Sequence, residues 1–224
     1  MKDMSPPLKE LLTEGLNAKR RGDHRNAREK FQAALVEAQR MKDDQGEANA
    51  LLELSAIAIQ VDSDRITARR LLEKCLEIYT RTQFDLGRAY AMSNLGSLAL
   101  DEGKYDNALQ WLNRALVIFE REQDKYGMAM TLHQMGKVDK QRGDIVSAEK
   151  RWRQSLLIFE GLGDKFAMGQ VLLSLAGVSF AHHKDLRQAK LLLNRALALF
   201  EELGLPHEAA KVRHNLAIIE RREK

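Results

Sequence analysis

The 224-residue sequence has very little cysteine and proline, and it has no long hydrophobic run. Its single cysteine excludes an intramolecular disulfide and a cysteine-rich zinc site. Its apolar runs are far shorter than the roughly 18 residues that a membrane-spanning helix needs. The N-terminal segment also lacks the apolar stretch of a signal peptide. These absences predict a cytoplasmic protein without a membrane segment.

The residues that are present favour helix. There are only 3 prolines, β-branched residues are sparse, and Ala, Leu, Glu, Lys, Arg and Gln dominate. Alanine and straight side chains lose little rotamer freedom in a helix. The sequence is 44% hydrophobic and 30% charged, as expected for a chain that folds around a core. We therefore predict an all-α fold.

The charge is only mildly unbalanced. Lysine and arginine number 36 and aspartate and glutamate 32, so the formal net charge is +4, and the basic residues are spread along the chain. Nucleic-acid-binding proteins usually concentrate basic residues on one face. The balance therefore permits an anionic partner without requiring nucleic acid.

The strongest pattern is a repeat of 40 to 41 residues. Each repeat has an alanine followed four positions later by a large residue, and a second small residue lies 12 or 13 positions before that alanine. The alanines are Ala27, Ala68, Ala108, Ala148 and Ala189. The upstream small residues are Gly15, Ser55, Gly96, Gly136 and Ala176.

Each repeat is predicted to form two helices joined by a short turn. The large residues recur at helical spacing on one face, and the small residues let two helix backbones approach closely. The variation of one residue is expected in the turn, where Gly22, Gly103 and Gly143 suit the position after a helix end. One helix pair cannot bury its apolar face alone, so successive pairs must stack. We predict a single domain over residues 1–224, with repeats at about 5–41, 42–82, 83–122, 123–162 and 163–203 and a C-terminal capping helix at about 206–222.

These motifs resemble the tetratricopeptide repeat (TPR) family. Repeat three has Leu95-Gly96 followed by Ala108, and repeat four has Met135-Gly136 followed by Ala148. The resemblance covers nearly the whole chain and implies a right-handed α-solenoid of five helix-turn-helix TPR-like repeats plus a capping helix. The period of 40 is longer than the usual 34 of the family, and the proline that often ends its second helix is missing.

The resemblance also places a candidate binding surface on the first helix of each repeat, which lines the concave face in this family and holds extended peptides. One column there is polar in every repeat and includes Asn94 and Gln134. It is either simply exposed or grips a peptide backbone. The apolar residues nearby are either covered by neighbouring helices or form pockets for a partner. The candidate residues are Leu52, Ile59, Tyr90, Asn94, Ser97, His133, Gln134, Lys137, Lys140, Leu173 and Phe180.

Repeat four adds basic residues to this surface. His133, Lys137 and Lys140 lie at i, i+4 and i+7, on one helical face. They form either a solvated face or a seat for an acidic partner segment. The family's clamp for a terminal carboxylate needs Lys and Asn in the first repeat, where this chain has Leu12 and Leu16. That type of chaperone-tail receptor is therefore not expected.

No motif points to catalysis, a cofactor or a metal. His182 and His183 are adjacent and point in different directions, and Cys75 occupies a small-residue column where a packed, inert thiol is expected. We predict a non-catalytic protein-interaction scaffold or adaptor that binds a peptide or helix of another protein. The alternatives are a peptide-responsive regulator, a nucleic-acid-binding repeat protein, an enzyme, and a homodimer formed through Tyr126, Met128, Met130 and the first repeat, which departs most from the repeat pattern.

Overall fold

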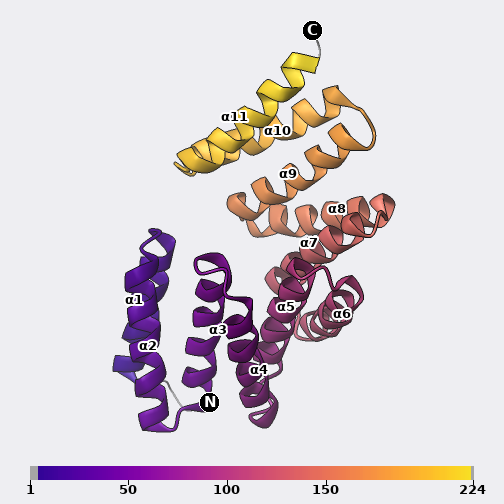
Figure 1. Ribbon diagram of the computed structural model, residues 1–224. Coiled ribbons are helices and arrows are strands. Elements are labelled where there is room, and N and C mark those ends of the chain that lie inside the picture. The colour runs from indigo at the N-terminus through magenta and orange to yellow at the C-terminus, as the bar shows by residue number, and fades with distance from the viewer. Residues whose placement is uncertain (1–4, 223–224) are drawn as a thin grey trace. The chain divides into compact units, whose positions relative to one another are not determined.

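The computed structural model describes residues 5–222, which form helices joined by short turns (Figure 1). No strand occurs in this part of the chain, so the predicted all-α class is confirmed. The helices found between residues 5 and 222 are α1 Pro6–Arg20, α2 His24–Met41, α3 Asp44–Gln60, α4 Arg65–Arg81, α5 Asp85–Asp101, α6 Tyr105–Arg121, α7 Lys125–Gln141, α8 Ile145–Leu162, α9 Lys165–Ala181, α10 Leu186–Glu202 and α11 Pro206–Arg222.

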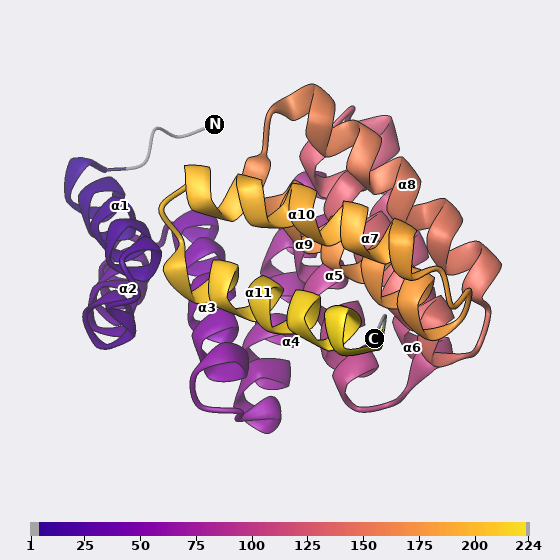
Figure 2. The ribbon, with the colours of Figure 1, turned by 90° about the horizontal axis from the view of Figure 1, so that it is seen from above.

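The chain forms two compact units, one up to Ile118 and one from Phe119. In the first unit, α1 packs on α2, α2 on α3, α3 on α4 and α4 on α5. In the second, α7 packs on α8, α8 on α9, α9 on α10 and α10 on α11. Figures 1 and 2 show these neighbours side by side. Helix pairs therefore stack within each unit, and a single superhelix over residues 1–224 stays a prediction.

The turns inside the helix pairs follow the sequence closely. Gly22, Gly103 and Gly143 have φ values of 77°, 74° and 85°, in the left-handed region that favours glycine. The α3–α4 and α9–α10 turns are one residue longer than the α1–α2 turn, and they place Ser63 and Lys184 at φ values of 53° and 57°. The additional residue of repeats two and five therefore lies in the turn, as predicted, and the helices keep their register.

Aspartate side chains cap most helix starts. Asp124 accepts a hydrogen bond from the backbone N–H of Gly127 at 3.0 Å, and Asp164 accepts one from Ala167 at 2.9 Å. The same contact occurs at Asp23, Asp43, Asp64, Asp144 and Asp185. These caps satisfy backbone donors that a helix cannot pair internally, so they fix where each helix begins.

The core of each pair forms where the upstream small residue meets the large residue of the second helix. A methyl group added at Gly15 would lie 2.6 Å from the Phe31 ring, and one at Gly136 would lie 2.4 Å from Trp152 Nε1. Both distances are too short for a real side chain, so a larger residue at either position would have to displace the ring or move the two helices apart. The five leading alanines and Ser55 are all fully buried at the same interfaces.

Candidate functional site

In the first unit, the predicted binding residues lie on α3 and α5. Leu52, Ile59, Tyr90, Asn94 and Ser97 are all half-buried. Leu52 and Ile59 pack against a buried cluster formed by residues of α3, α4 and α5. Their apolar side chains are therefore partly covered by neighbouring helices and partly accessible.

In the second unit, the basic face of α7 has a buried end. His133 is 8% exposed, its Nε2 lies 3.0 Å from Ser174 Oγ on α9, and its carbonyl accepts a hydrogen bond from Trp152 Nε1 at 3.0 Å. Burial, with a smaller contribution from Lys137, lowers the pKa of His133 to about 3. His133 is therefore neutral at pH 7, and the positive charge of this face comes from Lys137, which is half-buried, and Lys140, which is exposed.

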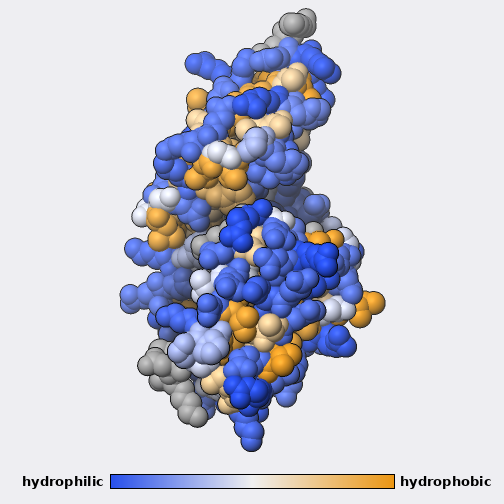
Figure 3. Space-filling view, turned by 90° about the vertical axis from the view of Figure 1, so that its left-hand side faces the viewer, coloured by the Kyte–Doolittle hydropathy of each residue, from blue (hydrophilic) through white to orange (hydrophobic). Residues whose placement is uncertain are grey.

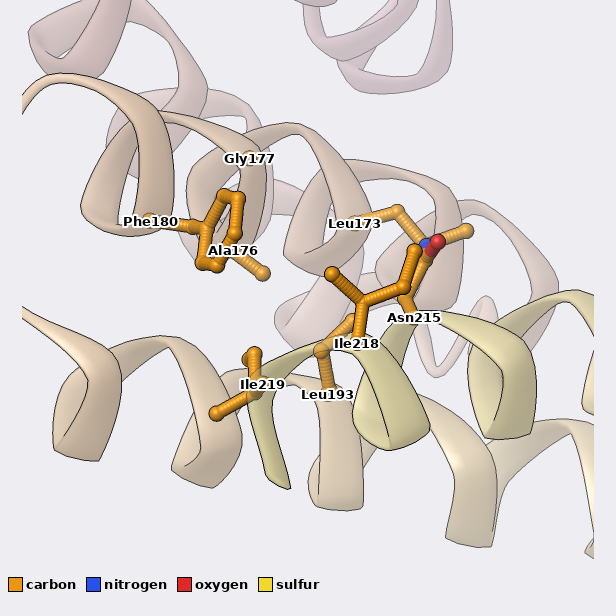
Figure 4. Close-up of a pocket in the computed structure, with 8 residues that line it drawn as sticks. All are labelled: Leu173, Ala176, Gly177, Phe180, Leu193, Asn215, Ile218 and Ile219. Atoms are coloured by element: carbon orange, nitrogen blue, oxygen red, sulfur yellow. The ribbon is translucent and has the colours of Figure 1, made fainter. Parts of the chain in front are cut away.

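The remaining candidates of the second unit lie on α7 and α9, and two of them line a cavity. Gln134 is half-buried on α7. Leu173 and Phe180 project from α9 toward α11, where they border a cavity of about 150 Å³ (Figure 4). The lining residues are Leu173, Ala176, Gly177, Phe180, Leu193, Asn215, Ile218 and Ile219.

The sequence columns that contain Ser174 and Gly177 continue to Asn215 and Ile218, and they lie on the same helix face as Leu173 and Phe180, so the sequence already pointed to this part of the chain. The columns could not show that α9, α10 and α11 enclose a cavity, because its walls come from three helices. The guanidinium carbon of Arg222 lies 4.6 Å from the centre of the Phe180 ring, a cation–π contact at the edge of this cavity.

The comparison with known families rests on the same repeats. The family model described as "Tetratricopeptide repeat" matches residues 47–121 and 87–161, which together span more than half of the chain. The chain belongs to the tetratricopeptide repeat family. The resemblance read from the repeat motifs is thereby confirmed.

Solved structures support the fold class as an α-solenoid of TPR-like repeats. BtubC (BKLC) from P. vanneervenii is 19% identical, with a TM-score of 0.68 over 88% of this chain and 81% of that chain. A Rap protein complexed with competence and sporulation factor is 15% identical, with a TM-score of 0.71 over 96% and 75%. A putative kinesin light chain from Podosopora anserina is 16% identical, with a TM-score of 0.62 over 90% and 99%. At these identities the likeness concerns the fold, and no curated protein sequence matches the chain.

Cys75 and His183, which the sequence raises as a possible nucleophile and a possible metal ligand, each contact another residue of the chain. Cys75 is fully buried, its Sγ lies 3.3 Å from the Ala48 carbonyl oxygen, and burial raises its pKa to about 12. The thiol is therefore protonated at pH 7, in agreement with the prediction of a packed cysteine. His183 Nε2 lies 2.5 Å from Glu149 Oε1. Between residues 5 and 222, no three His, Cys, Asp or Glu side chains come together as a metal site would require.

The surface of the TPR repeats carries scattered apolar side chains. Figure 3 shows separate hydrophobic patches on a mainly hydrophilic face. Tyr126 and Met130 are exposed on α7, and Tyr126 also packs edge-on against Phe159 with ring centroids 6.0 Å apart. Met128 is half-buried. The homodimer through these residues stays a prediction.

None of the described helices is long and apolar enough to cross a membrane.

Proposed function

We propose that this TPR chain is a non-catalytic scaffold. It binds a peptide or helix of another protein on the surface formed by the first helix of each repeat. The observation that carries the proposal is that each unit has a half-buried amide at the same repeat position of a first helix, Asn94 on α5 in the first unit and Gln134 on α7 in the second. An amide side chain offers both donors and an acceptor, which matches the paired donor and acceptor of a peptide backbone. Half-buried amides are also partly held in place, so they lose less freedom on binding.

The comparisons favour a binding role of this kind. The Rap protein with the same fold was solved in complex with competence and sporulation factor, so this architecture can hold a partner. A fixed helical surface lowers the ordering cost of binding, and a few apolar anchors then supply most of the affinity. The candidate anchors here are Leu52 and Ile59 in the first unit and Leu173 and Phe180 in the second.

The test compares a variant of the amides Asn94 and Gln134 with a variant of exposed residues on the second helix of two repeats, α6 and α8. Partners captured by the wild-type chain are identified by mass spectrometry, purified, and titrated calorimetrically against Asn94→Ala with Gln134→Ala. We expect the dissociation constant of this double variant to be at least about tenfold higher, because two hydrogen-bonding groups are lost. Its melting temperature should be unchanged.

The matched control is Val117→Ser with Leu157→Ser, because these side chains are 65% and 69% exposed on the second helices. The control should bind like the wild type. Equal affinity of the amide variant and the wild type would overturn the proposed surface. A captured nucleic acid whose affinity falls steeply and log-linearly with salt would favour the nucleic-acid alternative instead.

A further inference from the structure

The cavity between α9 and α11 is apolar and reaches the surface. Leu173, Phe180 and Ile219 form apolar walls, while Asn215 and Ile218 are exposed at its mouth (Figure 4). Apolar cavities of about 150 Å³ in other proteins hold a benzene-sized group. The volume therefore suits a single aliphatic or aromatic side chain.

Gly177 keeps this cavity open. It lies inside α9, where glycine costs helix stability relative to alanine. Its φ is not left-handed, and a methyl group added there would meet nothing within 4 Å, unlike one at Gly136, which would collide with Trp152. Neither backbone conformation nor close helix packing therefore requires glycine at position 177. What the missing side chain provides is empty volume in the cavity wall.

The charges around the mouth are of one sign. The residues one helical turn before and after Ile218 are His214, Asn215, Arg221 and Arg222. All four side chains are exposed, and none is acidic. Glu220 lies on the opposite side of α11, two residues from Ile218. Of the other two walls, α9 contains no acidic residue, and the acidic residues of α10, Glu201 and Glu202, lie about two turns beyond its lining residue Leu193. An apolar group that enters the cavity therefore lies beside the arginine and amide groups of α11.

We propose that this cavity binds one aliphatic or aromatic side chain of an acidic segment of a partner protein. Carboxylates beside that side chain pair with Arg221 and Arg222, and the Asn215 amide bonds the backbone of the segment. The proposal rests on the proposed scaffold function and gives it a partner chemistry. The cavity supplies an apolar anchor site, and the arginines select an acidic neighbourhood for it.

The probe is a phage-displayed library of random dodecapeptides, selected on the intact chain. We expect the selected peptides to share an apolar residue flanked by Asp or Glu. Gly177→Leu should weaken their binding about tenfold or more, because the leucine fills the cavity. The fold should persist, since the first atom of the new side chain meets no neighbour.

The matched control is Gly161→Leu, because a methyl group at this helical glycine also meets nothing, and Gly161 does not line the cavity. It should bind the selected peptides like the wild type. Arg221→Glu should weaken binding about tenfold. Arg187→Glu, which changes an exposed arginine of α10 outside the cavity lining, should have little effect.

The contrary outcomes are distinct. Peptides without acidic residues, or full affinity of Gly177→Leu, would overturn this proposal. If the selected peptides bind Gly177→Leu with full affinity but bind the Asn94→Ala, Gln134→Ala double variant more weakly, the scaffold function stands and only the cavity assignment falls. If no peptide is enriched, both proposals fail. A dimer in sedimentation experiments that Gly177→Leu disperses would assign the cavity to a second copy of the chain and overturn the acidic partner.

Discussion

Single residues set how closely the helices of a pair can approach. Trp152 fills the space left by Gly136, and its Nε1 donates to the His133 carbonyl at 3.0 Å. Gly136→Leu must separate α7 from α8 or displace the indole ring, and it also breaks this buried hydrogen bond. We expect the free energy of unfolding to fall by about 2–4 kcal/mol in urea denaturation.

Gly161→Leu provides the comparison for this substitution, because position 161 is exposed and a methyl group there meets no neighbour. It should change the unfolding free energy by less than about 0.5 kcal/mol. An unchanged denaturation midpoint for Gly136→Leu would mean that the small-residue column does not control helix separation.

His133 gives the stability a defined pH dependence. Its pKa is about 3 in the folded protein, against 6.5 as the ordinary value, so the unfolded chain binds its proton more readily. The contribution of the neutral side chain is therefore complete above pH 6.5 and is lost as the pH falls toward 3. Between pH 7 and pH 5, we expect the wild type to lose about 1–2 kcal/mol more than His133→Gln. Other titrating groups, such as Asp139, are common to both proteins, so parallel urea-denaturation curves would contradict this role of His133.

At the scale of elements, the sequence predicts the helices better than the turns between repeats. Five described non-glycine residues have left-handed φ values, and Gln123 is one of them at 56°. The equivalent position one repeat later is Gly163, at 69°. The sequence signals glycine turns, but it does not show that glutamine adopts the same conformation. The Asp124 cap and the backbone hydrogen bond from the Asp124 N–H to the Phe119 carbonyl, at 2.9 Å, hold this turn whichever residue occupies position 123.

This pair of positions allows a reciprocal test. Gln123→Gly removes the steric cost of a left-handed side chain and should stabilise the protein by up to about 1 kcal/mol. Gly163→Gln introduces that cost and should destabilise it by about 1 kcal/mol. Chemical denaturation measures both changes. Equal signs for the two variants would show that the turn conformation does not determine the effect.

The candidate binding surface was harder to predict because its character depends on contacts between elements. The sequence predicted that Leu173 and Phe180 share one helix face, and both line the same cavity, since helical periodicity alone decides which residues share a face. It grouped His133 with the two lysines but could not show that the imidazole is buried, with its Nε2 3.0 Å from Ser174 Oγ, and that this burial keeps it neutral. Likewise, the cavity appears only when α11 is set against α9. Periodicity fixes faces, and tertiary contacts decide which members of a face are buried.

For the whole molecule, repeat architecture predicts that damage remains local. In stacked repeats, each helix pair contacts mainly its neighbours, so stability is close to a sum of repeat and interface contributions. Gly136→Leu should therefore speed amide hydrogen exchange most strongly in α7 and α8, less in α9, and hardly at all in α1 and α2. Mass spectrometry of peptides from the exchanged, intact chain measures this profile.

The exchange profile also separates two descriptions of the molecule. If all helices lost protection equally, the chain would unfold as one cooperative body, and the division near Ile118 would have no energetic meaning. If protection is lost only from Phe119 onward, the two units open independently. A partner that binds residues of both units would then have to stabilise each of them separately, and its affinity should fall for variants that weaken either unit.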